Sequence, residues 1–307
     1  MGPLKGIKIL EFAGIGPGPF CGMLLADLGA EVIKISRPGS KGNGSKYDLN
    51  DRSKFSITLD LKNDESINEL KKLIIQVDAV FEGFRPGVME KLGLGPDDLL
   101  SINEKLVYGR MTGWGQEGLF SDMAGHDLNY LSITGALNAI GRKDERPPVP
   151  LNLIADYGGG GMLLAVGMLS ALIHSQKTGK GQVVDAAMID GTSMLMSLFY
   201  SFYGSGMWVN ERESNLLDGS AHFYDTYACK DGKYLAVACI EDKFYKEMLN
   251  KLEITDERFS KQFSKDMWPE LKSILEEKFL SKNRDEWAMI FKDSDACITP
   301  ILDLDEA

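Results

Sequence analysis

The chain has few of the residues that build metal centres and disulfide frameworks. Its 307 residues include three histidines and four cysteines, which are Cys21, Cys229, Cys239 and Cys297. The cysteines lack the paired spacing of a zinc site, and two of them lie in expected strands. We therefore expect no bound metal, no disulfide scaffold, and buried thiols in a reduced, cytosolic setting.

Long apolar runs and excess positive charge are also missing. The longest apolar run, residues 162–173, is too short to span a bilayer and predicts a buried helix. An apolar strand begins by Ile7 with no cleavage region after it, which argues against a signal peptide. The net charge of −11 argues against binding to nucleic acid or to an anionic membrane. A local basic pocket for an anionic ligand stays compatible with this charge.

The first part of the chain alternates apolar strands with helices. Strands are expected at residues 6–12, 30–36, 56–61, 78–83, 106–113 and 181–190. Continuous apolar strands of this kind are typical of a parallel sheet buried on both faces. The rhythm predicts a doubly wound, Rossmann-like α/β domain over residues 1–220, with a linking helical segment at about 190–220.

The pattern changes after about residue 220. Residues 224–240 form two alternating strands around Lys230-Asp231-Gly232, which is a hairpin signal. Helices follow near 241–252, 268–282 and 284–292, and then a short strand at CITPIL. We expect a smaller α+β domain over residues 221–307. The final LDLDEA follows this strand without a capping element, so we expect a further C-terminal segment to be missing.

The first glycine turn, GIGPGPF at residues 14–20, is a poor dinucleotide site. Pro17 and Pro19 remove two backbone N–H donors, and the next strand ends in Arg37 instead of an acid. Arg37, Lys62 and Arg85 each follow an expected strand, and parallel strands bring such positions to one edge of the sheet. Together the three cations suit a polyanionic ligand, although each alone is more often a solvated surface charge.

Three residues are candidate acids or bases. His126 stands at the expected start of a helix in AGHDLNYLSITGAL, where it is either a base or a helix cap. Asp156 ends an expected apolar strand before four glycines that open a helix, and an N-cap is its structural alternative. The glycines are expected to bring a ligand close to bare N–H groups at a helix start, where an oxyanion is stabilised. Glu241 opens another helix, where taken alone it is a favourable first-turn acid.

Taken in order, these motifs resemble the family III coenzyme A transferases. The matching stretches include GIGPGPF, LLADLGAEVIKISRP, EGFRPGVMEKLGLGP, AGHDLNYLSITGAL, PLNLIADYGGGGM and GKGQVVDAAMIDG, and they extend over essentially the whole chain. The resemblance implies an interlocked homodimer whose active site is shared between the large domain of one chain and the small domain of the other. It places His126, Asp156 and Glu241 at catalytic positions.

The resemblance also implies a coenzyme A site. The positions that it assigns to coenzyme binding are Arg37, Leu59, Asp60, Leu61, Lys62, Gly83, Phe84, Arg85, Lys91, Gly125, Asp127 and Tyr130. Coenzyme A is part of the substrate, so no separate cofactor is expected.

Two branches of the family differ in chemistry at this site. Transferases use the aspartate matching Asp156 as a nucleophile, carry a glutamine in the first glycine turn, and lack a histidine matching His126. This chain has His126 and no glutamine in GPGPFCGM, which favours the racemase branch. We therefore expect inversion of the 2-methyl centre of 2-methylacyl-CoA thioesters by two-base proton transfer through an enolate.

Two alternatives are a transferase with Asp156 as nucleophile and a non-catalytic acyl-CoA-binding protein. The expected location is cytoplasmic, with a peroxisome or mitochondrion open for a eukaryotic source. The sequence does not select an acyl chain.

Overall fold

The chain divides into two units, each with its own hydrophobic core. The computed structural model describes residues 2–12, 14–39 and 47–307. Unit 1 comprises Met1–Leu137 with Val149–Leu198, and unit 2 comprises Asn138–Pro148 with Phe199–Ala307.

Unit 1 is built on a six-stranded sheet whose order is β3-β2-β1-β4-β5-β6, with every neighbouring pair parallel. The strands are β1 (Lys8–Phe12), β2 (Glu31–Ser36), β3 (Phe55–Thr58), β4 (Ala79–Glu82), β5 (Val107–Thr112) and β6 (Gln182–Ala187). The predicted parallel α/β sheet is thus confirmed. The strand order reverses between β1 and β4, and ligands of doubly wound sheets bind beyond the carboxyl ends of the strands at such a point.

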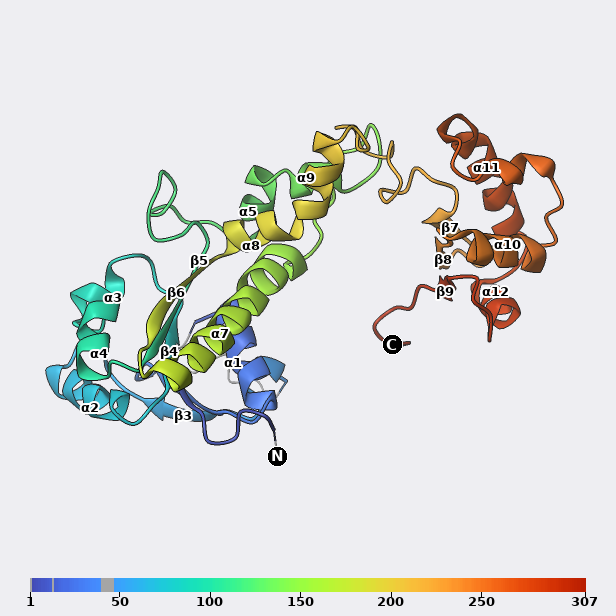
Figure 1. Ribbon diagram of the computed structural model, residues 1–307. Coiled ribbons are helices and arrows are strands. Elements are labelled where there is room, and N and C mark those ends of the chain that lie inside the picture. The colour runs from blue at the N-terminus through green and yellow to red at the C-terminus, as the bar shows by residue number, and fades with distance from the viewer. Residues whose placement is uncertain (1, 13, 40–46) are drawn as a thin grey trace. The chain divides into compact units, whose positions relative to one another are not determined.

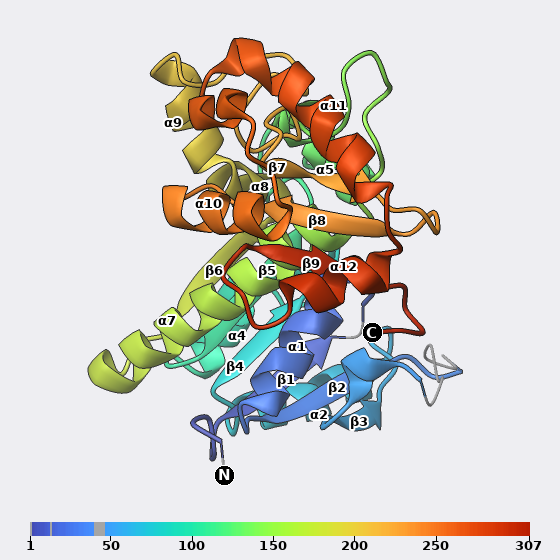
Figure 2. The ribbon, with the colours of Figure 1, turned by 90° about the vertical axis from the view of Figure 1, so that its right-hand side faces the viewer.

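Both faces of this sheet are buried. Ile9 and Val107 contribute to one core, and their neighbours Leu10 and Tyr108 contribute to the other, because side chains alternate along a strand. The helices α1 (Pro17–Asp27) and α7 (Leu163–Thr178) cover the first face. The helices α2 (Asp64–Ile74), α3 (Val88–Lys91) and α4 (Pro96–Ile102) cover the second (Figures 1 and 2).

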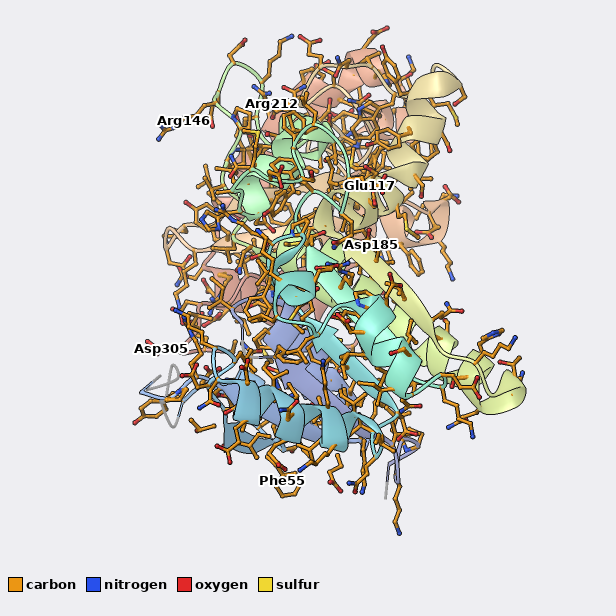
Figure 3. All side chains as sticks on the ribbon, turned by 90° about the vertical axis from the view of Figure 1, so that its left-hand side faces the viewer. Phe55, Glu117, Arg146, Asp185, Arg212 and Asp305 are labelled. Carbon is orange, nitrogen blue, oxygen red and sulfur yellow. The ribbon has the colours of Figure 1, made fainter. Side chains whose placement is uncertain are left out.

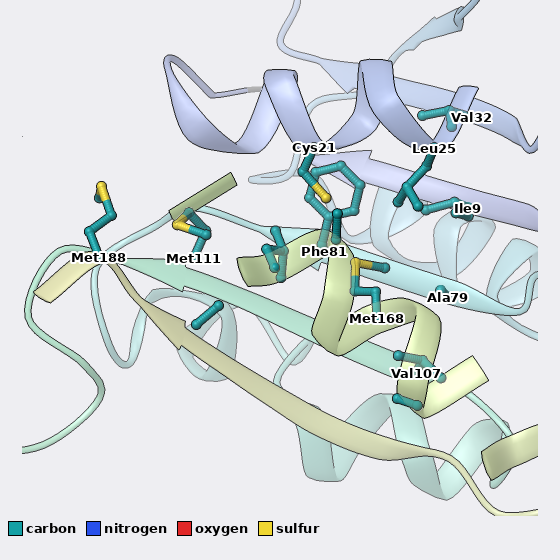
Figure 4. Packing of buried hydrophobic residues seen from close by; sticks show 14 of the residues in the cluster. Ile9, Cys21, Leu25, Val32, Ala79, Phe81, Val107, Met111, Met168 and Met188 are labelled. Atoms are coloured by element: carbon teal, nitrogen blue, oxygen red, sulfur yellow. The ribbon is translucent and has the colours of Figure 1, made fainter. Parts of the chain in front are cut away.

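The core on the first face is drawn in Figure 4. Cys21 and Leu25 of α1 and Met168 of α7 pack against Ile9 and Phe81 of the sheet. At the sheet edge, Phe55 on β3 points away from the protein and is 64 % exposed (Figure 3). In contrast to this edge strand, the continuously apolar strands of the sequence have helices on both sides.

The remaining helical segments of unit 1 gather near the carboxyl ends of the strands. They are η1 (Leu49–Asp51), α5 (Asp127–Ile133), α6 (Ala136–Ala139), the π-helical η2 (Leu153–Met162) and α8 (Met188–Leu195). The segment before Asp156, predicted to be an apolar strand, is thus π-helical from Leu153 onward. The prediction was wrong because the apolar side chains there pack tightly against α1 and α8 and do not alternate between two faces as in a strand.

The π-helical η2 continues directly into α7. Together they form one helix, Leu153–Thr178, which is long and apolar enough by length and composition to cross a membrane. Half of its most apolar window is buried inside the protein, and α7 packs against β5 and β6. The apolar run at 162–173 is therefore part of a longer helix that covers the sheet.

Unit 2 holds the predicted hairpin. The strands β7 (Tyr224–Ala228), β8 (Tyr234–Ala238) and β9 (Ile298–Pro300) form an antiparallel sheet in that order. Its helical segments are α9 (Ser197–Gly204), α10 (Asp242–Lys251), η3 (Glu257–Lys261), η4 (Lys265–Met267), α11 (Trp268–Phe279) and α12 (Arg284–Phe291). Gly232 adopts a φ of 76° in the turn between β7 and β8, which explains why glycine stands there.

The boundary between the two units, as defined by their internal contacts, differs from the predicted boundary at residue 220. Residues 138–148 and 199–220 belong to unit 2. The guanidinium of Arg142 pairs with Asp225 at 2.6 Å and with Glu213 at 2.9 Å, and Arg212 donates to the carbonyl of Arg142 at 3.0 Å. These charge contacts between distant segments leave no local composition signal, which is why the two divisions of the chain differ.

A buried ion pair joins β1 to the first turn of α1. Lys54 Nζ lies 2.6 Å from Glu11 Oε2 and donates to the Pro19 carbonyl at 2.9 Å. Both side chains are almost fully buried, and burial raises the pKa of Glu11 to about 7 against the opposing effect of Lys54. A Cβ on Gly22 would lie 2.0 Å from Glu11 Oε2, so the ion pair has room only because residue 22 is glycine.

We predict that Lys54→Met lowers the free energy of unfolding by about 3–5 kcal/mol, because it leaves a buried carboxylate without its partner. The double variant Glu11→Gln with Lys54→Met should recover most of this loss. Lys54 lowers the pKa of Glu11, so its loss raises that pKa above 7, and the penalty of the single variant should shrink as the pH falls through this range and Glu11 takes up a proton. Urea unfolding measures these values. The control Lys72→Met, at the exposed pair with Glu69, should cost less than about 1 kcal/mol, and an equally small effect of Lys54→Met would contradict the prediction.

Candidate active site

A cavity of about 700 Å³ opens beyond the carboxyl ends of β1, β4 and β5. His126 and Asp156 both line it, so the structure brings these two predicted residues together. They come from different elements: His126 precedes α5, and Asp156 lies in η2. An acid and an imidazole therefore line the same cavity.

His126 occupies the N-cap position of α5, but its ring does not cap the helix. Its backbone is extended, with a φ of −134°, and its carbonyl accepts from the N–H of Asn129 at 2.8 Å. Asn129 Oδ1 in turn accepts from the N–H of His126 at 3.0 Å. No hydrogen bond to the imidazole is found within the described part of the chain, so the ring is free to serve a ligand.

Asp156 is half-buried in the first turns of η2. Asn152 is the N-cap of this helix, so the N-cap alternative for Asp156 was wrong. Asn152 Nδ2 donates to Asp156 Oδ2 at 3.2 Å. Burial raises the pKa of Asp156, and the nearby Asp127 acts in the same direction, while Asn152 and His126 oppose it. The carboxyl is therefore biased toward holding a proton.

The first glycine turn packs beside this acid. Gly16 has a left-handed φ of 68°, and a Cβ on it would lie 3.4 Å from Asp156 Oδ2. The proximity of Gly16 to Asp156 was not predicted from the sequence. The only signal available was a glycine just before the helix-starting Pro17, which is typical of a turn but says nothing about its distant neighbour.

Asp127 faces inward and lines neither of the two large cavities of unit 1. Its side chain is 4 % exposed, and Oδ2 accepts from the backbone N–H groups of Ala155 at 2.8 Å and Asp156 at 2.9 Å. The carboxylate of Asp127 is therefore engaged with η2, and the coenzyme contact of this residue stays a prediction.

The glycine row after Asp156 serves packing. Gly159, Gly160 and Gly161 are buried within η2. A Cβ on Gly159 would lie 2.7 Å from the backbone N of Thr192 in α8, and one on Gly161 would lie 2.9 Å from the carbonyl of Pro17 in α1. The prediction that these glycines admit a ligand to bare N–H groups is wrong, because they admit neighbouring helices instead.

A second cavity of about 770 Å³ shares Phe12, Gly16 and Phe84 with the first. It is lined by Arg37 and by the run Leu59, Asp60, Leu61 and Lys62, which follow β2 and β3. Lys34 also lines it but pairs with Asp51 at 2.6 Å. The predicted edge of the sheet thus carries Arg37 and Lys62, with no ion pair to either found in the described residues.

Other predicted coenzyme positions lie on the first cavity. They are Gly83, Phe84, Arg85, Gly125 and Tyr130. Lys91 lines neither cavity, although Val88 and Leu92 on the same helical segment line the second, so its predicted contact is not supported by its position. Trp114, which follows β5, lines the first cavity and was missed; its position beyond a strand end was the available signal.

Glu241 belongs to unit 2 and is the N-cap of α10, one position earlier than the predicted first turn. Its carbonyl accepts from Phe244 and Tyr245 at 3.0 Å each, while its exposed carboxylate makes no capping bond. That carboxylate is available to an outside donor, and its pairing with His126 stays a prediction. No cluster of three or more His, Cys, Asp or Glu residues arranged for a metal ion occurs in residues 2–12, 14–39 and 47–307.

We predict that Gly159→Ala lowers the free energy of unfolding by about 1–3 kcal/mol, because the new methyl group meets the backbone of Thr192. The matched control is Gly158→Ala, whose Cβ would meet its nearest atoms, in Leu153 and Leu195, at 3.3 Å. Helix propensity should offset that contact and keep its change within about 1 kcal/mol. Urea unfolding compares the two. Equal stabilities would contradict the packing role of Gly159.

Comparison with known proteins shows the family of this chain. Residues 4–307 match the family described as CoA-transferase family III. The α-methylacyl-CoA racemases of Mus musculus and Homo sapiens are 45 % and 44 % identical to this chain over 99 % of its length, which covers 79 % and 78 % of theirs. The crystal structure of Rv3272 from Mycobacterium tuberculosis superposes with a TM-score of 0.82 at 29 % identity, over 99 % of this chain and 84 % of that one. The chain therefore belongs to CoA-transferase family III.

Proposed function

We propose that this chain is an α-methylacyl-CoA racemase, which inverts the 2-methyl centre of 2-methylacyl-CoA thioesters. The observation that carries the proposal is the shared cavity, where an imidazole without a hydrogen-bond partner in the described chain and an acid of raised pKa face one space. The names of the mouse and human relatives support the same reaction.

The chemistry needs two groups on opposite faces of one carbon. A thioester acidifies its α-proton because the carbanion delocalises onto oxygen as an enolate. Neutral His126 removes this proton from the (S)-ester, and protonated Asp156 returns a proton to the other face. The roles reverse for the (R)-ester. The raised pKa of Asp156 favours the protonated form that the first direction requires.

The enolate oxygen requires N–H donors, and the structure narrows the choice. The glycine N–H groups lie within η2, and Asp127 already accepts from the N–H of Asp156. The backbone N–H groups that follow His126 at the start of α5 remain as candidate donors. We assign the enolate to this position.

Three cations near the two cavities would bind the coenzyme A part of the substrate. Arg37 and Lys62 on the second cavity, and Arg85 on the first, supply positive charge to an otherwise acidic protein. Phosphate groups of coenzyme A would bind there, with the thioester extending into the cavity of His126 and Asp156. Coenzyme A enters as part of the substrate, and no other cofactor is needed for proton transfer.

We further propose an interlocked homodimer in which Glu241 of one chain accepts the second ring N–H of His126 of the other. This contact would fix the tautomer of His126 and stabilise its protonated form. Unit 1 exposes apolar side chains along the helix that runs through η2 and α7 and on α8, and these would be buried by a second chain. They are Leu153, Met162, Val166, Ile173, Met194 and Leu195.

We predict that the protein exchanges the α-proton of either enantiomer of a 2-methylacyl-CoA ester with deuterated water. His126→Ala and Asp156→Ala should each lower inversion by about 100-fold to 10,000-fold, because each removes one proton-transfer group. The control His174→Ala removes an exposed histidine of α7 and should leave the rate unchanged. Mass spectrometry and chiral chromatography measure exchange and inversion.

Three other outcomes would contradict the proposed function or its two-base scheme. Transfer of the acyl group to a free-acid acceptor without α-deuteration would identify a transferase that uses Asp156 as nucleophile. Tight acyl-CoA binding without deuterium uptake would identify a binding protein. Near wild-type inversion by Asp156→Ala would refute the two-base scheme.

The shared site predicts complementation between two damaged chains. Chains carrying His126→Ala and chains carrying Glu241→Ala should each lose activity, and co-expression should restore part of it. A mixed dimer then contains one site with both wild-type residues. Tagged mixed dimers purified by two affinity steps allow the inversion rate to be measured. If His126 and Glu241 act within one chain, the mixed dimer will show no recovery.

A further inference from the structure

The Asp127 carboxylate joins the two residues of the candidate site. Asp127 follows His126 directly in the chain, and its Oδ2 accepts from the backbone N–H of Asp156 at 2.9 Å. A second bond, from the N–H of Ala155 at 2.8 Å, fixes the carboxylate on the same turn of η2. One side chain therefore sets the spacing between the backbone that carries His126 and the backbone that carries Asp156.

This carboxylate is also under-satisfied. The side chain of Asp127 is 4 % exposed, and its Oδ1 is buried without a hydrogen-bond partner in the part of the chain that the structure describes. An orphaned charged oxygen in a protein interior is costly and calls for an explanation. Two short backbone bonds would hold a neutral amide oxygen as well, so the bonds alone do not explain why an acid stands here.

The charge acts on Asp156. Burial is the main cause of the raised pKa of Asp156, and the negative charge of Asp127 adds to it. The other titratable groups near this carboxyl are His126, which lowers its pKa, and Tyr130 of α5, whose own pKa is raised first by burial and then by both acids. Among neighbouring helices, Asp190 of α8 acts on Asp185 of β6, and Gly16 at the start of α1 lies beside Asp156.

We propose that Asp127 is a positioning residue for Asp156, fixing its backbone and holding its carboxyl in the protonated form that one direction of the reaction needs. The inference rests on the proposed racemase function for its purpose, but the coupling between the two acids is testable without activity. The Asp127 carboxylate contacts no substrate in this scheme and acts through Asp156.

The test is the titration of the Asp156 carboxyl, followed by NMR on protein labelled with carbon-13 at aspartate and assigned through Asp156→Asn. In Asp127→Asn an oxygen acceptor stays while the charge is lost, so the midpoint of Asp156 should move to lower pH. Asp78→Asn is the matched control, because Asp78 also accepts from a backbone N–H, that of Lys8, at 2.8 Å. Asp127→Ser provides a second neutral acceptor should the asparagine variant fail to fold.

Activity provides the second readout. We expect Asp127→Asn to lower α-proton exchange about tenfold and Asp127→Ala about 100-fold, because the alanine variant also frees the backbone of Asp156. The acid limb of the pH profile should move to lower pH by the same amount for both enantiomers, since the enzyme cannot alter the equilibrium between them. The control Asp78→Asn should leave both the rate and the profile unchanged.

The outcomes separate the two proposals. An Asp156 midpoint that is the same in wild type and Asp127→Asn would overturn the role of Asp127. A wild-type protein without α-proton exchange would overturn the racemase function, while the carboxyl titration would still decide whether Asp127 controls Asp156.

Discussion

Direct backbone contact between η2 and its neighbours is the constraint on which the candidate site depends. A Cβ on Gly191 of α8 would lie 1.8 Å from the carbonyl of Gly159, so no side chain fits between these helices. The same close approach puts Gly161 against Pro17 of α1. Because η2 is held this tightly, Asp156 has a fixed place beside the first glycine turn, and α7 continues from it across the sheet.

The sheet supplies the second part of the site. Its strand order reverses between β1 and β4, which leaves room for a ligand beyond their carboxyl ends. Cations that are far apart in the sequence, Arg37 after β2 and Lys62 after β3, line one cavity there. The adjoining cavity holds His126 and Asp156, so the architecture places two cations on a cavity that adjoins one lined by an imidazole and an acid.

The sequence predicted features that periodicity encodes, and it failed where segments distant in the chain touch. Strands buried on both faces are continuously apolar, so β1 and the parallel sheet were predictable, as were cations after strand ends. Gly159 looked like ligand access because its neighbour Thr192 is 33 positions away. The bonds of Asp127 to Ala155 and Asp156 were not predicted, because nothing near Asp127 in the chain reveals them.

The two groups of a two-base site must begin each turnover in opposite protonation states, which is difficult when they share one cavity. The structure places the two candidate groups in different environments. His126 is exposed at the start of α5, while Asp156 is half-buried and lies near the charge of Asp127. Burial and the charge of Asp127 both raise the pKa of Asp156, so the structure favours the neutral form of this carboxyl relative to a solvated aspartate.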